Sequence, residues 1–445
     1  MTATMSRPAT SRPTSVARGY RFELVKLFAQ WRVRLLVLAC WVAPGLFVAA
    51  VSLQSSLPVD TLFGRWMNVT GWAGSLVMLG FAGTYALPLL TSLVAGDVFA
   101  AEDRLGTWRH LLVAVRSYRR IFVAKALASL TVILVLVTGM AGSSALGGLL
   151  AVGNRSLVGL DGHLLAPADA AGKVLLAWLC VLAPTLALAG VGLLGSVALG
   201  RSPMGLLLPA VVAIAMALAQ LLPLPVAVRL SLPSYAFISW EGLFTSPPQL
   251  GPLLISMAVG LVWAAVATAL AYVLFLRRDF TSLADNSGRR GLVVGAAPLV
   301  GLVVVAFAAV AASTPSLGSG IERDKLQNSL ATAFAHLYRL QAEQLHRPAV
   351  TEAQLGATAT CTKGDGLVVP QGAGNDWRCV VSWHLPGVAA TGQAIYQLDV
   401  TPDGRFMADG DGPKDVNGYY QVRTPAGDRP NPLWQFDGNV ELLPA

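Results

Sequence analysis

GDVFAAEDRLGTWRHLLVAVRSYRRIFVAK, residues 96–125, is a charged stretch of helix length that separates two strongly apolar runs. Apolar side chains recur within it at steps of three and four, which aligns them along one face of a helix: Val98, Ala101, Leu105, Trp108, Leu112 and Val115. Charged side chains fall elsewhere: Asp97, Glu102, Asp103, Arg104 and Arg109. The pattern predicts an amphipathic helix held against a membrane or a partner, and a solvated helix that merely connects two spans is the alternative.

Composition places the whole chain among membrane proteins. Hydrophobic residues make up 54% of it and charged residues only 13%, and the mean hydropathy is +0.60. Charge is also unevenly distributed, because residues 1–312 carry 22 Lys and Arg against 10 Asp and Glu, whereas residues 313–445 carry 10 against 14. The basic residues cluster beside apolar runs, so membrane topology explains them better than a nucleic-acid partner does.

Seven apolar runs are long enough to cross a hydrocarbon core, which takes roughly 20 residues per helix. They are residues 35–53, 72–95, 121–152, 174–199, 204–226, 252–276 and 292–312. The alternate loops that would lie on the same side of the membrane as the N-terminus hold 18 basic residues, and the loops on the other side hold 4. This bias predicts an N-terminus in the cytoplasm and a C-terminal region outside the cell membrane. The predicted fold is a polytopic α-helical membrane protein with a small outer domain.

The N-terminal region divides into two parts. Residues 1–19 hold little to bury and predict a disordered cytoplasmic tail. Leu24, Leu27, Phe28 and Trp31 then form one face of a predicted helix. Its other face carries Glu23, Lys26, Gln30 and Arg34, which is typical of a helix lying in the membrane interface. A cytosolic extension of the first span is the alternative.

Several residues of the opening stretch carry a family resemblance. They are Phe99, Glu102, Gly106, Thr107, Leu111 and Leu112, followed by Arg116, Arg119, Ile121 and Lys125. This order resembles the first cytoplasmic loop of ABC-2 type permeases, the membrane subunits of bacterial ABC exporters. The resemblance implies a six-helix membrane domain over residues 20–290, with the helix near residues 23–34 as its elbow helix.

The resemblance also implies a site and partners. The cytoplasmic loop would form the coupling helix that docks on a cytosolic ABC ATPase, which binds ATP and Mg²⁺, and a second permease copy or a sister permease would complete the pathway. The implied docking residues are Glu102, Asp103, Arg104, Gly106, Thr107 and Arg109. The aromatic segment 229–248 corresponds to short re-entrant helices in such permeases, with an ordinary interfacial loop as the alternative. The family resemblance does not extend to the seventh predicted helix, residues 291–312, or to the outer domain, residues 313–445.

The outer region predicts an α+β domain. Leu326, Leu330, Ala333, Leu337 and Leu340 recur with helical spacing, which indicates a helix over residues 321–344. Residues 377–383 and 393–400 read as strands, and Thr401-Pro402-Asp403-Gly404 reads as the turn after the second.

Two cysteines in this domain predict a disulfide. Cys361 and Cys379 would close a short loop, a gain of about 3 kcal/mol. Metal binding is the competing use, although His384 alone completes no familiar ligand set. Acidic residues gather nearby, at Asp399, Asp403, Asp409, Asp411 and Asp415. Their spacing does not match an EF-hand, so a solvated acidic face is the preferred interpretation over a calcium site.

Motifs for intrinsic catalysis are missing from the sequence. Gly172-Lys173 is followed by Val174 and does not complete a P-loop, and neither HExxH nor GxSxG occurs. The apolar runs also hold almost no ionisable residue deep inside, unlike those of ion-coupled carriers. We therefore expect no enzyme activity and no cofactor in this chain, and a role as an ATP-driven permease for an apolar or amphipathic substrate. The alternative is a membrane receptor or assembly factor whose outer domain binds a ligand or a surface protein.

Overall fold

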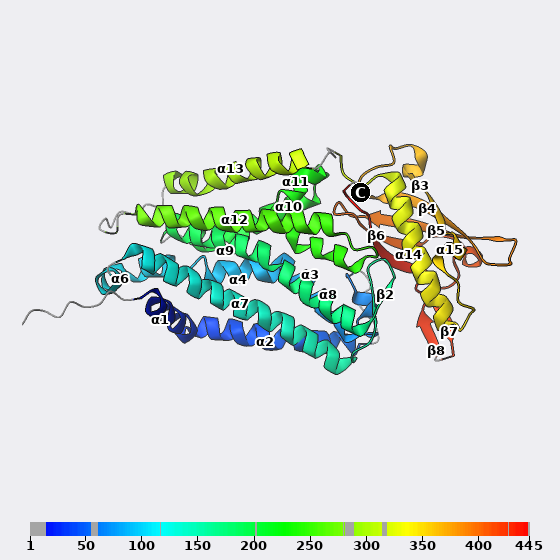
Figure 1. Cartoon of the computed structure of the whole chain (residues 1–445), viewed down its shortest axis with the longest axis horizontal. Coiled ribbons are helices and arrows are strands. Elements are labelled where there is room, and N and C mark those ends of the chain that lie inside the picture. The colour runs from blue at the N-terminus through cyan, green and yellow to red at the C-terminus, as the bar shows by residue number, and fades with distance from the viewer. Residues whose placement is uncertain are drawn as a thin grey trace, which may run out of the picture.

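The computed structural model describes residues 15–443 except 55–60, 116, 201–202, 279, 281–288, 314–317 and 426. Helices run side by side along the long axis, and a β-sheet domain covers one end of this bundle (Figure 1). The helices and small strands of the bundle are α1 (Val16–Ala29), α2 (Trp31–Ser52), η1 (Gly64–Trp66), α3 (Gly71–Phe81), η2 (Ala82–Ala86), α4 (Leu87–Val94), α5 (Ala100–Leu105), α6 (Trp108–Val115), α7 (Tyr118–Ala151), β1 (Leu157–Val158), β2 (Leu164–Leu165), α8 (Pro167–Cys180), α9 (Leu182–Ala198), α10 (Pro203–Leu221), α11 (Val226–Leu230), η3 (Pro233–Phe237), η4 (Ser239–Phe244), α12 (Leu250–Leu276) and α13 (Arg289–Ser313).

Five helical segments are long and apolar enough to cross a membrane. They are Trp31–Ser52, Gly71–Val94, Tyr118–Ala151, Pro167–Ala198 and Leu250–Leu276. The other two predicted spans also form helices, α10 and α13, whose described apolar parts are shorter, Gly205–Leu221 and Leu299–Ala312. Five of the seven predicted spans therefore meet the length and hydropathy of a membrane span within the described residues, and the other two are present as shorter apolar helices.

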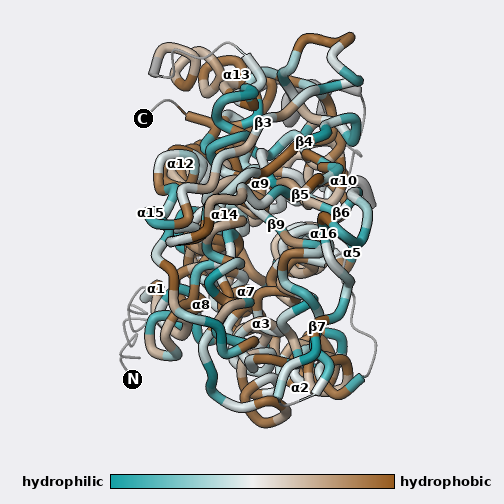
Figure 2. Tube along the Cα trace, turned by 90° about the vertical axis from the view of Figure 1, so that its right-hand side faces the viewer, coloured by the Kyte–Doolittle hydropathy of each residue, from teal (hydrophilic) through white to brown (hydrophobic). Residues whose placement is uncertain are grey.

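The outer faces of these helices are apolar. α2 and α13 lie at opposite edges of the bundle (Figure 2). Leu38 and Leu46 on α2 are 60% and 66% exposed, and Val305 on α13 is 65% exposed. A protein in water rarely exposes a continuous apolar face of this size, whereas a bundle in a bilayer needs one.

The chain enters the bundle through a bent pair of helices. Residues 1–14 of the predicted tail lie outside the described residues, and residues 16–19 are helical, because Ser15 caps α1 by accepting a hydrogen bond from the Arg18 N–H at 3.4 Å. The predicted faces of this helix are partly wrong. Glu23 is buried, whereas Trp31 begins α2 and is 74% exposed. Glu23 is buried because its carboxylate pairs with Lys125 of α7.

The outer domain has one helix packed on an antiparallel sheet. Its elements are α14 (Arg323–Gln344), α15 (Glu352–Leu355), β3 (Thr358–Lys363), η5 (Gly364–Gly366), β4 (Gly374–His384), β5 (Thr391–Val400), β6 (Arg405–Gly410), α16 (Lys414–Asn417), β7 (Gln421–Thr424), β8 (Gly427–Pro430) and β9 (Gln435–Asn439). The five-stranded sheet has the order β3-β4-β5-β6-β9, and β7 pairs with β8 apart from it. The predicted helix, both predicted strands and the turn at Thr401–Gly404 are confirmed.

Apolar and polar residues alternate along β5, which lets the sheet bury one face. Tyr396, Leu398 and Val400 of β5 are all buried, while Gln397 and Asp399 between them are exposed. Phe334 of α14 packs on this face, with its ring 6.3 Å from that of Tyr396.

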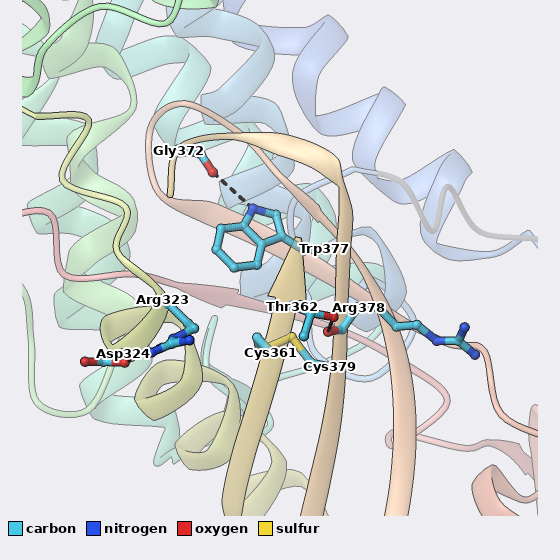
Figure 3. The surroundings of a disulfide bond; sticks show 8 residues. All are labelled: Arg323, Asp324, Cys361, Thr362, Gly372, Trp377, Arg378 and Cys379. Atoms are coloured by element: carbon cyan, nitrogen blue, oxygen red, sulfur yellow. Dashed lines mark hydrogen bonds and ion pairs between the residues drawn. A yellow bond between two sulfur atoms is a disulfide. The ribbon is translucent and has the colours of Figure 1, made fainter. Parts of the chain in front are cut away.

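The predicted disulfide is present. Cys361 of β3 and Cys379 of β4 are directly opposite in the antiparallel register, with Cα atoms 4.1 Å apart, and their sulfur atoms are bonded (Figure 3). Beside them Trp377 is fully buried, and its Nε1 donates a hydrogen bond to the Gly372 carbonyl at 3.0 Å. His384, at the end of β4, hydrogen-bonds Thr391 through Nε2. The two cysteines thus bond to each other rather than to a metal.

The aromatic segment 229–248 forms short helices, η3 and η4, at the sheet end of the bundle. Polar contacts join this end to the outer domain. Arg65 pairs with Asp437 of β9, and Gln249 and Asn439 exchange two hydrogen bonds, at 2.7 and 3.2 Å. The sheet domain is therefore fastened to the bundle rather than tethered by a linker alone.

Candidate functional site

Residues 96–125 fold into two short helices and the start of a long one. α5 ends at Gly106, which adopts φ +65°, a left-handed conformation that glycine reaches without strain. α6 follows, and α7 begins at Tyr118. The expectation of one continuous amphipathic helix is wrong, because this glycine turns the chain. The turn lies at the end of the bundle opposite the sheet (Figure 1).

The start of α5 is held by a side chain from another helix. Ser196 of α9 is fully buried, and its Oγ accepts hydrogen bonds from the backbone N–H groups of Phe99 and Ala100 at 3.0 and 2.9 Å. The first N–H groups of a helix have no partner within it. A hydroxyl on α9 therefore fixes where α5 begins.

Glu102 lies at the centre of a buried ionic cluster. Its carboxylate accepts hydrogen bonds from Lys125 at 2.7 Å, from Lys26 and from the Thr107 hydroxyl. Lys125 also contacts the Glu23 carboxylate at 2.9 Å, and both Glu102 and Lys125 are only 1% exposed. This one carboxylate thereby joins α5 to α1 and α7.

The electrostatic balance at Glu102 favours the charged form. Burial raises the pKa of its carboxyl group, but the positive charge of Lys125 and the hydrogen bonds from Lys125, Lys26 and Thr107 outweigh this, so the pKa falls to about 2. Glu102 is therefore an anion at any physiological pH.

Two more acids tie the same loop to other helices. Asp97 is 2% exposed and pairs with Arg32 of α2 and with Arg104. Asp103 accepts hydrogen bonds from Arg278, which follows α12, and from the Trp108 indole N–H, both at 2.7 Å. Together with Glu102, these acids connect the loop to α1, α2, α7 and the end of α12.

Aromatic rings fill the space beneath the ionic contacts. Phe99 stacks on Phe122 with ring centres 5.3 Å apart, and lies 5.1 Å from Phe275 of α12. Trp108 packs 5.0 Å from Phe280, which in turn stacks on Tyr118 at 5.3 Å. The loop is thus packed as well as paired, so it will move together with the helices it touches.

The predicted docking residues separate into two groups. Glu102 and Asp103 are buried and face inward, which contradicts their expected place on an outward polar face, and Thr107 is half-buried against Glu102. Arg104, Gly106 and Arg109 are exposed. We call the exposed surface of α5, α6 and the start of α7 the tip, and define it by Arg104, Leu105, Gly106, Arg109, His110, Val113, Ala114, Tyr118 and Arg119.

The tip combines exposed apolar side chains with positive charge. Leu105 and Val113 are 69% and 75% exposed, and arginines flank them. Such a surface suits a partner that offers an apolar groove with an acidic rim.

Sequence reasoning missed the residues that brace the tip. They are Glu23, Lys26, Arg32, Lys125, Ser196 and Arg278. A usable signal existed for Lys125, a charge seven residues into an apolar helix, because such a charge needs a partner. Nothing in the sequence pairs Ser196 with a backbone 97 residues away.

A metal site finds no support among the residues described. No group of three or more His, Cys, Asp or Glu side chains there is placed to hold an ion. The acidic residues predicted as a solvated face are spread over β5, the turn after it, β6, the following loop and α16. No protein-family model, curated protein or solved structure matches the chain.

Proposed function

We propose that this chain is the membrane-spanning permease subunit of an ATP-driven exporter of the ABC-2 type. The observation that carries the proposal is the tip, an exposed surface whose base is fixed by three buried acids that pair with α1, α2, α7 and the end of α12. A partner that pushes on the tip would displace these helices, because ion pairs and closely packed aromatic rings join them to it. ATP hydrolysis would take place in that partner.

The distribution of charge in the spans supports an external energy source. The Asp, Glu, Lys and Arg residues of the five long apolar segments lie near the segment ends, as Lys125 and Lys173 do, rather than at mid-depth. A carrier driven by an ion gradient needs titratable or ion-binding groups near the membrane centre. Transport would therefore depend on work delivered at the tip.

The proposed topology places the tip in the cytoplasm and the sheet domain outside the cell membrane. The disulfide supports this orientation, because such bonds persist in oxidising compartments and are rare in the cytosol. The basic loops also gather at the tip end of the bundle, as positive-inside topology requires.

Single-cysteine labelling tests this topology with little background. The native Cys40 and Cys180 are buried, and Cys361 and Cys379 are bonded to each other. A membrane-impermeant maleimide should label Leu367→Cys, 92% exposed in the outer domain, in intact cells. It should label Val113→Cys only after lysis. Labelling of both variants in intact cells would contradict the proposed topology.

Docking is tested by a charge placed on the tip. Val113→Asp changes a side chain that is 75% exposed, so we expect the fold to be retained and co-purification of the ATPase to be lost. Leu367→Asp is the matched control at the other end of the molecule and should leave the association unchanged. If both variants still retain the ATPase and its substrate-stimulated hydrolysis, the tip is not the docking surface. If Leu367→Asp alone releases a bound protein, the outer domain is the interaction site and the receptor alternative is favoured.

A further inference from the structure

A large groove lies in the half of the bundle that is nearer to the sheet domain and farther from the tip. It has a volume of about 580 Å³, which is in the range of small-molecule sites. Its walls are mostly apolar and come from η2, α4, α9, α10 and η3, and the turn at residues 401–403 of the outer domain closes its end. Ile214 and Leu218 in its wall are 60% and 58% exposed, so the groove opens sideways toward the surroundings of the bundle.

The length of the groove matches one leaflet of a bilayer. Its lining runs along α10 from Ala210 to Leu221. Eleven residues of α-helix rise about 16 Å at 1.5 Å each. A hydrocarbon core is about 30 Å thick, so the groove spans roughly half of it. An acyl chain of one leaflet has this reach.

A buried cation lies at the end of the groove next to the outer domain. Arg229 of α11 is 2% exposed and lines the groove. Its Nε donates a hydrogen bond to Gln220 Oε1 at 3.2 Å, and its guanidinium carbon lies 5.7 Å from the Tyr235 ring centre. The negative charge of Asp403, which lines the same end of the groove, acts on this guanidinium, but among the residues that the structure describes Arg229 forms no ion pair within 4 Å.

A buried arginine without a paired anion is costly, because a charge taken out of water needs a counterion or a full set of hydrogen bonds. The guanidinium presents several N–H donors in a planar fork that matches phosphate. Asp403 also lines this end of the groove, where a carboxylate can accept hydrogen bonds from hydroxyl groups. In a phosphate ester that carries hydroxyl groups and an acyl chain, the phosphate would pair with Arg229, the hydroxyl groups would donate to Asp403, and the acyl chain would contact the apolar walls.

We propose that the groove binds an anionic phospholipid from the outer leaflet, with its phosphate on Arg229 and an acyl chain along α10 and η2. This inference deepens the proposed function by naming a substrate class, and it rests on that function for the step that moves the lipid. Binding itself requires only this chain. A failure of binding is therefore distinguishable from a failure of ATPase docking.

The test measures lipid binding by the purified full chain in detergent micelles without any ATPase. Phosphatidylglycerol and diacylglycerol with the same acyl chains are titrated, and bound lipid is counted by native mass spectrometry. We expect phosphatidylglycerol to bind at least tenfold more tightly than diacylglycerol. Arg229→Gln should reduce this preference about tenfold, and Arg229→Lys should retain part of it because it keeps the charge.

A second pair of variants tests the groove without touching Arg229. Ala217 lines the groove and is exposed, so Ala217→Trp should fill it and weaken the binding of both lipids while the fold is retained. Ala215→Trp, exposed on the same helix but outside the lining, is the matched control and should bind as the wild type does. Equal binding of the two lipids by the wild type would overturn the proposal. So would a phosphatidylglycerol preference that survives in both Arg229→Gln and Ala217→Trp.

Discussion

Replacing Glu102 by Gln tests whether the tip is braced by buried charge. The change keeps the shape of the side chain and removes the anion that faces Lys125 and Lys26. A pKa lowered from the ordinary 4.5 to about 2 corresponds to roughly 3 kcal/mol, at about 1.4 kcal/mol for each step of one in pKa. Breaking a buried ion pair by removing one partner costs about 3 to 5 kcal/mol. We therefore expect Glu102→Gln to destabilise the chain by roughly 3 kcal/mol.

The measurement is the free energy of unfolding of the purified chain in micelles, from thermal or denaturant scans at pH 7. Asp324→Asn is the control, because the Asp324 side chain is 83% exposed and pairs with Arg323 only at 3.5 Å. An exposed pair of this kind contributes less than about 1 kcal/mol. A loss below 1 kcal/mol for Glu102→Gln would refute the bracing role of the cluster.

The pH dependence of the folding stability is a second, independent test, because the direction of the change is fixed by the pKa of Glu102. The folded pKa of Glu102 lies below its ordinary value, so the stabilisation it gives is complete above about pH 5 and disappears as the pH falls through the folded pKa near 2. Glu102→Gln should therefore lie furthest below the wild type in stability at neutral pH and approach it in acid. A gap of constant size from pH 7 to pH 3 would mean that the loss comes from packing rather than from the charge.

Three further changes test other parts of the molecule. Gly106→Ala must adopt φ +65°, so we expect a loss of about 1 to 2 kcal/mol in unfolding scans, although open space surrounds the position. Removing the disulfide by changing Cys361 and Cys379 to Ala together should cost about 3 kcal/mol, measured as the unfolding of the outer domain with and without reductant. Asp161 lies in the turn between β1 and β2; burial raises the pKa of its carboxyl group, but His163, the Ser246 N–H and His336 of α14 outweigh this and lower it, so Asp161→Asn should loosen the contact between the β1–β2 turn and α14. Faster hydrogen exchange in α14 at neutral pH, with a smaller difference in acid, is the expected result.

The apolar runs predicted most of the bundle, because a helix in lipid must be apolar over a length that the bilayer sets. The outer domain was predictable in part for a similar reason. Alternation along β5 marked a strand, and two cysteines in one domain marked a disulfide. Strands β3, β6 and β9 were missed, since they are short and their pattern emerges only once their neighbours are paired.

The candidate site was harder to predict because its residues meet only in three dimensions. Periodicity assigned Glu102 to an outward face, since it treats every charge as solvated. In the folded chain Lys125 comes from α7 and Lys26 from α1, and their charges make burial of Glu102 favourable. Gly106 carried a usable signal, because a glycine at the end of a short helical pattern predicts a C-cap rather than a continuous helix.

One helix connects the tip to the groove. Ser196 near the end of α9 holds the first N–H groups of α5, and Leu188 of the same helix lines the groove. The two residues are eight positions apart, a rise of about 12 Å along a helix. α9 also packs extensively against α12, whose following residue Arg278 pairs with Asp103. A displacement of the tip would therefore be transmitted along α9 to the groove wall.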